Sequence, residues 1–283
     1  MGERIEVRGF RPGVSTQTNP HPALSLEKGE ATRPTCFPIG RQNTIVAADC
    51  AMIAVTFALP AESSEFLRRL RNKSRADRNG VRIIRGNIDD REIEILHTGV
   101  GEKVCRERLG KFLQDQQFDL LISAGFAGAL KEELRVGDLF LAKNFSTFDL
   151  NERRSLFSSL PIHIADLLTV PALIDSREER NNMARESAAA AVDMETKFIA
   201  RGCAAHALPL LSIRVISDTP RNLFPAPPDV LFDIERQQTQ IVKLAKYFLS
   251  HPHRAPHLVQ FARRIAHARK ILASALVALI KEL

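Results

Sequence analysis

Residues 208–220 read LPLLSIRVISDTP, an almost unbroken apolar run that ends in an acid and a proline turn. Two more runs have the same character, MIAVTFAL at 52–59 and FDLLISAGF at 118–126. Strands that are apolar along their whole length lie in sheets with both faces covered, and helical patterns separate these three runs. The sequence therefore predicts an α/β fold, with a mixed central sheet flanked by helices on both faces in a three-layer sandwich.

The remaining periodic segments extend this sheet and supply its covering helices. Further strands are expected at GVRIIRGNI (80–88), REIEILHTGV (91–100) and GDLFLAKNF (137–145). Helices are expected at about 61–71, 103–116 and 193–205. Because strands and helices alternate without an internal repeat, residues 51–250 are predicted to form one principal domain.

Residues 1–50 differ in composition from that domain. They are rich in Pro, Gly, Thr and charged residues and show no sustained helical or strand periodicity. Such a segment cannot bury enough apolar surface to offset the entropy of ordering, so we predict a disordered N-terminal extension. Met52 opens the first strand, which raises the hypothesis that residues 1–51 precede the natural start. Mass spectrometry of the natural N-terminus tests it.

Residues 251–283 are predicted to form a basic amphipathic helix. Its apolar residues repeat at intervals of three and four from Leu258 to Leu279 and form a single stripe. From residue 243 to the end there are eight Lys or Arg and one acid, a net charge of +7, which equals the formal net charge of the whole chain. The basic character therefore belongs to this tail.

Two interpretations of the tail stay open. In one, the helix packs on the domain and its cationic face is solvated. In the other, it attaches peripherally to a membrane surface, with Phe261, Ile265 and Leu272 in the interface and Arg264 and Arg269 reaching anionic headgroups. Nucleic acid is not an expected partner.

The composition argues against several classes of protein. The four cysteines, at 36, 50, 105 and 203, are far apart and form no CxxC pair, which argues against a zinc site and a disulfide framework. No run reaches the roughly 20 apolar residues of a membrane span, and the N-terminus MGERIEVRGF lacks the apolar core of a secretory signal. We expect a cytoplasmic protein without metal or cofactor, with the inner membrane surface as the alternative location.

Three acids stand at the ends of strands, where open α/β sheets display functional groups. Glu62 follows the first strand in FALPAES, Glu195 lies in VDMET, and Asp218 ends the strand in IRVISDTP. Each also has a structural interpretation, because Glu62 and Glu195 would favour a helix N-terminus through its dipole and Asp218 would cap a turn. Glycine turns at HTGVG and SAGFAGAL add backbone N–H groups that a ligand can approach closely.

These motifs together resemble a known family. SAGFAGAL with RVGDLFLA, AVDMETKFIA and IRVISDTP are similar to segments of the nucleoside phosphorylase and nucleosidase superfamily, whose members cleave the N-glycosidic bond of nucleosides. The resemblance covers roughly Met52 to Pro220, and its most specific element is VDMET followed by ISD at this separation. The first strand looks most like that of the 5′-methylthioadenosine/S-adenosylhomocysteine nucleosidases, in which a short strand ends in an acid that opens a helix.

The resemblance assigns a role to each acid. Glu62 aligns with the acid that orients the attacking water, and Asp218 with the acid that faces the purine base. Met194 and Glu195 match the residues that hold the sugar, where Glu195 accepts hydrogen bonds from the ribose hydroxyls.

Other residues of the same motifs are expected nearby. Ala127 and Gly128 lie in the turn that lines the base pocket, and Thr98 and Gly99 belong to the other glycine turn beside the substrate. Asp193 is expected at the start of a helix, with a direct role in substrate binding as the alternative.

The implied reaction explains why the site requires acidic residues. Departure of the base leaves an oxocarbenium-like ribosyl cation, which nearby carboxylates stabilise, as in glycoside hydrolysis. A purine leaves far more easily when N7 is protonated, so an acid at Asp218 has to carry or relay a proton.

The nucleophile is expected to be water. Phosphorylases of this superfamily hold phosphate with arginines near the first strand and the second glycine turn, where this chain reads FALPAES and HTGVGEK. Glu62 would repel an anion there, although His97 and Thr98 remain candidate anion ligands and phosphorolysis remains the alternative. The segment LLTVPALIDSREERNNMARE occupies the place of the family's base-stacking aromatic and contains none, so base identity stays open beyond an adenine-type purine.

A further branch of the superfamily resembles this chain in less specific features. The hopanoid-associated phosphorylase-like proteins, which release adenine from adenosylhopane, share VDME, a Pro-rich loop after the ISD strand and an Arg- and Ala-rich C-terminal helix. A lipid-linked nucleoside is therefore an alternative substrate. The resemblance implies a homo-oligomer, a dimer, with a nucleoside as its small-molecule partner. A non-catalytic nucleoside-binding protein on the same fold is the alternative of another class.

Overall fold

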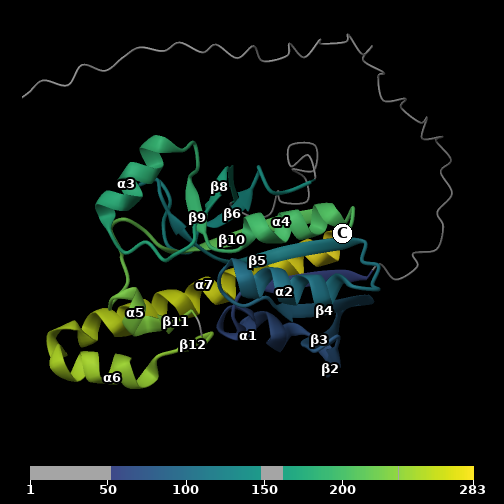
Figure 1. The fold of residues 1–283 in the computed structure, drawn as a ribbon, viewed down its shortest axis with the longest axis horizontal. Helices are drawn as coiled ribbons and strands as arrows, with labels where there is room; N and C mark the ends of the chain where they lie inside the picture. The colour runs from purple at the N-terminus through teal and green to yellow at the C-terminus, as the bar shows by residue number, and fades with distance from the viewer. Residues whose placement is uncertain (1–51, 148–161, 235) are drawn as a thin grey trace, which may run out of the picture. The chain divides into compact units, whose positions relative to one another are not determined.

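The computed structural model describes residues 52–147, 162–234 and 236–283 (Figure 1). The expected disordered extension, residues 1–50, and the cysteines at 36 and 50 lie outside the described residues. Residues 52–283 fall within one compact unit that contains both the predicted domain and the C-terminal helix.

The elements follow the predicted alternation of strands and helices. The strands are β1 (Ile53–Phe57), β2 (Arg71–Arg78), β3 (Val81–Ile88), β4 (Arg91–His97), β5 (Leu120–Ala129), β6 (Leu139–Ala142), β7 (Ile162–Ala165), β8 (Leu167–Thr169), β9 (Ala191–Asp193), β10 (Leu210–Asp218), β11 (Phe232–Asp233) and β12 (Gln238–Thr239). The helices are α1 (Pro60–Arg69), α2 (Glu102–Leu113), α3 (Arg177–Glu186), α4 (Thr196–Ala205), α5 (Pro228–Leu231), α6 (Ile241–Ser250) and α7 (Ala255–Glu282), with a 3-10 turn η2 (Pro252–Arg254) before α7.

The main sheet is mixed, which confirms the predicted fold class. Its strands run in the order β2-β3-β4-β1-β5-β10-β6-β7, and β9 pairs with both β5 and β8. The central strands β4, β1, β5 and β10 are parallel to one another, whereas β2–β3, β3–β4 and β10–β6 are antiparallel pairs. Because the central strands are parallel, their carboxyl ends meet at one edge of the sheet.

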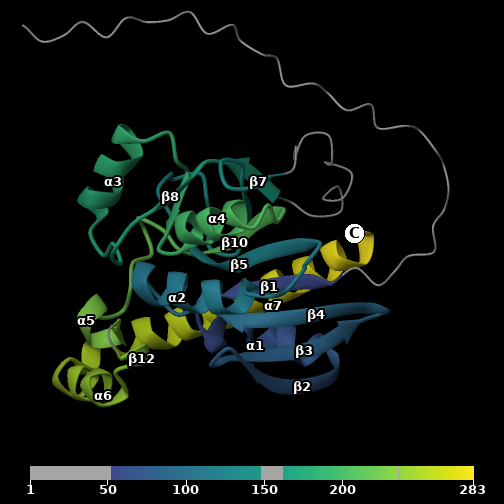
Figure 2. The same ribbon diagram turned by 45° about the vertical axis from the view of Figure 1, so that its right-hand side comes forward.

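The two faces of the sheet are covered by different helices. Alternate residues of β1 show this division, since Ile53, Val55 and Phe57 pack in a core with α1 and α7, whereas Ala54 packs with α2 and α4. A strand places successive side chains on opposite faces, so one apolar strand supplies both cores. The result is the expected three-layer sandwich, in which α7 runs from beside α6 across the sheet to the C-terminus (Figures 1 and 2).

Several elements differ from the sequence expectations, including β7, β8, β9 and α3, which were not predicted, and two of the differences have a local physical reason. The helix expected at 193–205 begins only at Thr196, because Asp193 still pairs with Thr169 as the last residue of β9. The edge strand β2 was not predicted, since its sequence RNKSRADR is polar and almost wholly exposed, and it therefore lacks the apolar alternation of a half-buried strand.

Helix α7 corrects one of the two interpretations of the tail. Ile265, Ala268, Leu272, Ala275 and Leu279 of the predicted stripe are buried, and those from Ala268 on belong to the core beside the sheet. The interpretation that puts Ile265 and Leu272 into a membrane is therefore wrong, because the protein's own core already covers them. Within the described residues, no helix combines the length and the hydropathy that a membrane span requires.

Candidate active site

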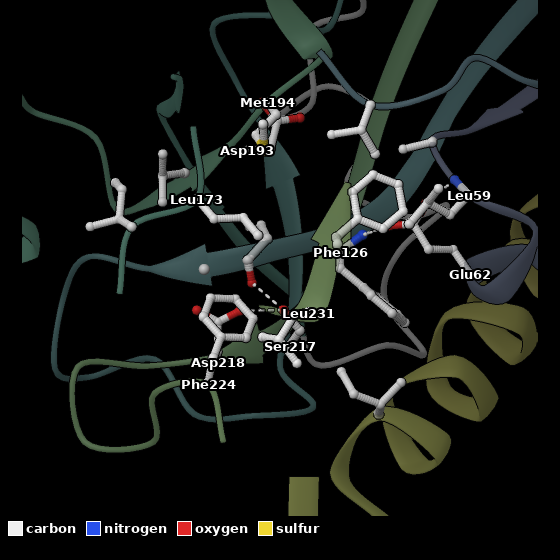
Figure 3. Close-up of a pocket in the computed structure, with 18 of the residues that line it drawn as sticks. Leu59, Glu62, Phe126, Leu173, Asp193, Met194, Ser217, Asp218, Phe224 and Leu231 are labelled. Atoms are coloured by element: carbon white, nitrogen blue, oxygen red, sulfur yellow. Dashed lines mark hydrogen bonds between the residues drawn. The ribbon is translucent and has the colours of Figure 1, made fainter. Parts of the chain in front are cut away.

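A cavity of about 360 Å³ lies at the carboxyl edge of β1, β5 and β10 (Figure 3). This is the edge at which open α/β sheets bind ligands, and the volume is that of a small-molecule site. Most of the residues singled out in the sequence line it: Glu62, Ala127, Gly128, Asp193, Met194, Glu195 and Asp218. They come from four separate segments of the chain.

Glu62 lies in the first turn of α1, directly after β1. Its Oε2 accepts a hydrogen bond from the Leu59 N–H at 3.0 Å, and its Oε1 accepts one from the Phe126 N–H at 3.1 Å (Figure 3). Burial raises the pKa of Glu62 in spite of these two hydrogen bonds, which oppose the shift. The carboxyl is thus fixed between the end of β1 and the end of β5.

Glu195 is the residue before α4, and its carboxyl reaches the second glycine turn. Its Oε1 accepts a hydrogen bond from the Gly101 N–H at 3.0 Å. Burial, together with the neighbouring charges of Asp193 and Glu62, raises the pKa of Glu195 to about 8. Near neutral pH this buried carboxyl therefore holds or exchanges a proton.

Asp193 lies only two residues away but has different partners. Its Oδ2 accepts from the Arg214 Nη2 at 3.0 Å, and its two oxygens accept from the Thr196 N–H, which opens α4. Its Oδ1 also accepts from the Thr169 hydroxyl at 2.9 Å. The two carboxyls of VDMET therefore differ in their surroundings. Asp193 binds the protein's own groups, whereas the Glu195 carboxyl accepts a hydrogen bond from Gly101 and borders the cavity.

Asp218 ends β10 at the opposite wall of the cavity. The pairing of β10 with β5 shifts between Ile216 and Asp218, a bulge that sets Asp218 opposite Gly128. The Asp218 carboxylate forms a buried ion pair with Arg180 of α3 and accepts a hydrogen bond from the Ser217 hydroxyl at 2.6 Å. Arg180 is held in turn by the carbonyl oxygens of Ile174 and Ala129.

Gly128 makes this ion pair possible. A Cβ at that position would lie 2.9 Å from the Asp218 Oδ2 and 2.9 Å from the Arg180 Nη1, closer than side-chain carbons approach such atoms. The glycine predicted in the base pocket is thus required by the close approach of two charged groups.

Behind Glu62 and Glu195 lies a second, much smaller cavity, with about 10 Å³ available to the centre of a water molecule. Polar groups of Thr56, Ser123 and Arg214 line it together with the two glutamates. The Thr56 hydroxyl is buried and has no hydrogen-bond partner among the described residues. This space matches one water molecule, which would satisfy that hydroxyl.

Thr98 and Gly99 do not line the main cavity. The Thr98 side chain is buried, with its hydroxyl 3.3 Å from the Phe57 carbonyl oxygen, and a Cβ on Gly99 would meet Val104 at 2.6 Å. The next two residues of the turn contribute to the site instead. Val100 lines the cavity, and the Gly101 N–H donates a hydrogen bond to Glu195.

His97, the candidate anion ligand beside that turn, also faces away from the acids. Its Nε2 lies 2.8 Å from the Ser63 hydroxyl, and burial and the Arg108 charge lower the pKa of His97 to about 4. A neutral imidazole of this kind carries no charge to attract an anion at neutral pH.

The rest of the cavity wall is apolar and was not identified from the sequence. Phe126 lies beside Glu62 and Phe224 beside Asp218 (Figure 3), so aromatic rings enter from SAGFAG and from the Pro-rich loop. Farther out, the wall comes from α5 to α7 and the adjoining strand: Leu231, Phe232, Ile234, Leu244, Leu258, Phe261 and Ile265. The amphipathic pattern of α6 and α7 indicates that the wall residues of these two helices are covered, but not that a cavity lies against them.

Arg269 of α7, like Arg180 of α3, is a charged member of the lining that was not predicted. Only the membrane interpretation of the tail gave it a role, at lipid headgroups. Instead it borders this cavity, and its buried Nε has no hydrogen-bond partner among the described residues. The structure therefore brings four carboxyls, those of Glu62, Asp193, Glu195 and Asp218, and the guanidinium groups of Arg180 and Arg269 around one apolar space. No group of His, Cys, Asp and Glu among the described residues could hold a metal ion.

Comparisons with known proteins identify the family of the chain. The family model described as "Phosphorylase superfamily" matches residues 52–159 and 153–250. The 5′-methylthioadenosine/S-adenosylhomocysteine nucleosidase of Staphylococcus aureus (strain MRSA252) is 24% identical over 196 residues, which cover 59% of this chain and 86% of that protein.

Solved structures show the same fold at lower identity. The Streptococcus pneumoniae MTA/SAH nucleosidase in complex with 8-aminoadenine is 20% identical, with a TM-score of 0.60 over 82% of this chain and all of that one. The futalosine hydrolase of Helicobacter pylori is 15% identical, with a TM-score of 0.61 over 82% of this chain and 99% of that one.

Proposed function

Because the chain belongs to the phosphorylase superfamily, we propose that it cleaves the N-glycosidic bond of an adenine-type purine nucleoside by hydrolysis and releases the free base. The observation that carries the proposal is the convergence of Glu62, Glu195 and Asp218 on one apolar cavity. A non-catalytic binding protein would not need three buried carboxyls around a site, because each one is costly to remove from water.

The geometry around Glu62 supports water as the nucleophile. A water molecule in the small cavity between Thr56, Ser123 and Arg214 is adjacent to the Glu62 carboxyl, which accepts its proton as it attacks. With a pKa of about 8, Glu195 is largely protonated near neutral pH in the free protein. The positive charge that develops on the sugar favours its ionised form, which accepts hydrogen bonds from the ribose hydroxyls and stabilises that charge. The raised pKa of Glu62 suits a base that operates near neutral pH.

Asp218 serves the leaving base from the opposite wall. Its carboxylate already accepts from Arg180 and Ser217, and it has remaining lone pairs that face the cavity. A solvent proton is relayed through the Asp218 carboxylate to N7, and the carboxylate then accepts the N7–H hydrogen bond and stabilises the base as it leaves. The proton that Glu62 takes from the attacking water returns to solvent after the products leave. Phe126 and Phe224 supply apolar faces for the purine ring.

Phosphorolysis is the second candidate, and Arg269 is the observation in its favour. A guanidinium with an unpaired buried nitrogen beside the cavity is a ligand that phosphate would satisfy. Glu62 opposes this candidate, since its carboxyl occupies the side from which the nucleophile approaches.

Within the same reaction, an apolar group on the ribose 5′ carbon fits the outer wall best. That wall is made of leucine, isoleucine and phenylalanine side chains of α5 to α7 and the adjoining strand, and Arg269 is the charged residue that α7 adds to the lining. This composition supports the lipid-linked nucleosides, such as adenosylhopane, as an alternative to a methylthio or homocysteinyl substituent.

The test is release of base from a panel of nucleosides. The parent protein is incubated with methylthioadenosine, S-adenosylhomocysteine, adenosine, inosine and a lipid-linked adenosine, and free base is measured by chromatography. Base should appear from at least one adenine nucleoside, and Glu62→Gln should slow its release while leaving nucleoside affinity nearly unchanged. Binding without release from any of them would favour the non-catalytic alternative.

A further inference from the structure

The large apolar side chains that are exposed among the described residues all lie in one part of the chain. They are Ile234, Ile241, Val242, Leu249 and Val259, and Ile241 and Leu249 are 72% and 82% exposed. Single exposed apolar residues are scattered over most proteins, so their confinement to α6, the start of α7 and the turn before α6 requires an explanation.

The geometry of α6 shows why these side chains are uncovered. Its apolar face is wider than the surface that the domain covers: Leu244 lines the cavity, whereas Ile241, Ala245 and Leu249, at intervals of four, are exposed. Residues four apart share one face of a helix, so these three form a stripe, with Val242 beside it. Figures 1 and 2 show α6 next to the first turns of α7, at the end of α7 opposite the C-terminus.

The charged residues of α6, and of α7 up to Lys281, are all basic. Between residues 236 and 281 the chain contains no Asp or Glu, and Lys243 and Lys246 are exposed on α6 itself. Arg254 and Arg263 follow at the start of α7, both exposed. Apolar side chains flanked by lysine and arginine are the pattern of a helix that lies in the plane of a lipid interface.

We propose that Ile241, Val242, Leu249 and Val259, together with Lys243 and Lys246, form a surface that docks on an anionic lipid bilayer. This α6–α7 surface is distinct from the stripe at 265–279, which is buried in the core. The apolar side chains enter the interface, and the lysines contact anionic headgroups.

A second copy of the chain is a poorer occupant of this surface. In a two-fold contact the same patch faces itself, so Lys243 and Lys246 would meet the lysines of the other copy. No acid of α6, or of α7 up to Lys281, is available to pair with them. An anionic bilayer supplies the opposite charge in excess.

The position of the surface links it to the site. Leu244, Leu258 and Phe261 line the cavity from the inner side of α6 and α7, whose outer sides carry the α6–α7 surface. Docking would therefore place the apolar end of the cavity at the bilayer. This link rests on the proposed function, but membrane docking itself does not, and the two claims fail separately.

The experiment is sedimentation of the full-length protein with vesicles of phosphatidylcholine, alone or mixed with phosphatidylglycerol. The protein should bind the mixed vesicles, bind pure phosphatidylcholine much more weakly, and lose affinity as salt increases. Ile241→Ser with Leu249→Ser should weaken binding about tenfold or more, because both side chains lose their apolar burial in the interface. Lys243→Glu with Lys246→Glu should abolish the preference for anionic lipid.

A matched control is Lys103→Glu with Lys143→Glu, two exposed lysines outside the α6–α7 surface, which should leave vesicle binding unchanged. None of these positions lines the cavity, so cleavage of a water-soluble nucleoside should be the same in every variant. A protein that ignores anionic vesicles at low salt would overturn the proposal. So would a dimer that the Ile241 and Leu249 variants dissociate without any vesicle binding by the parent, which would assign the surface to a second copy of the chain.

Discussion

At the scale of single residues, Asp218 and Arg180 depend on each other. Both side chains are almost wholly buried, and each is the charged partner of the other. Removing one charge of such a pair leaves the other uncompensated, which costs about 3–5 kcal/mol of stability. The stability and the catalytic role of Asp218 therefore have to be measured separately.

We predict that Asp218→Asn lowers kcat about 10²-fold or more, because the amide cannot stabilise the protonated base as a carboxylate does. It should also lower the free energy of unfolding for the reason just given. The double variant Asp218→Asn with Arg180→Met should recover most of the stability but none of the activity. Recovery of activity together with stability would show that Asp218 is only structural.

Glu195 predicts a pH dependence of stability whose sign is fixed by its pKa. That pKa is about 8 in the folded protein against an ordinary 4.5, so the folded state keeps a proton that the unfolded chain releases. The free energy of unfolding should therefore fall as pH rises from 4.5 to 8, by at most about 1.4 kcal/mol per pH unit. Urea unfolding at several pH values should show this slope reduced in Glu195→Gln, and parallel curves for parent and variant would contradict it.

Gly128 offers a geometric test of the base pocket. Gly128→Ala should separate Arg180 from Asp218 and lower kcat/KM by about tenfold or more, since small misplacements of catalytic groups are costly. Gly110→Ala is the matched control, because Gly110 lies in helix α2 and a Cβ at this position would have no neighbour within 4 Å. Equal kinetics for the two variants would remove the case for a constrained pocket.

At the scale of elements, α7 combines a structural half with an exposed half. Residues from Ile265 on pack under the sheet, whereas the first turns are largely exposed and carry Val259. Helix α7 thus contributes side chains both to the apolar outer wall of the cavity and to the core.

We predict that Leu276→Ala lowers the free energy of unfolding by about 2–5 kcal/mol, because Leu276 is fully buried in the core. Ser274 lies two residues earlier in the same helix and is exposed, so Ser274→Ala should change the free energy of unfolding little. Thermal or urea unfolding of both variants measures the difference. An equally small effect at Leu276 would mean that α7 is not part of the core, and its stripe would again be available to a membrane.

At the scale of the whole molecule, the sequence located the residues that stand at strand ends. Glu62, Gly128 and Asp218 could be placed together because parallel apolar strands bring their carboxyl ends to one edge. Arg180 could not, because it lies in a helix whose other residues are all exposed or half-buried, and nothing in SREERNNMARE marks one arginine as buried.

The residues of the outer cavity wall could not be predicted from the sequence for a related reason. The spacing in α6 and α7 indicates amphipathic helices but does not tell which neighbour covers each side. The predicted stripe was correct from Leu258 to Leu279, yet its second half is buried in the core and its first half, at Leu258 and Phe261, lines the cavity. Arg269, which the membrane interpretation placed at lipid headgroups, lines the cavity.

The central claim is that water attacks the nucleoside in this site, with Glu62 as the base. The most direct measurement is the identity of the sugar product when the parent protein cleaves its nucleoside in phosphate buffer and in phosphate-free buffer. We predict the free sugar in both, released with the base at the same rate. A sugar 1-phosphate, formed only when phosphate is present, would contradict the account and assign the anion to Arg269.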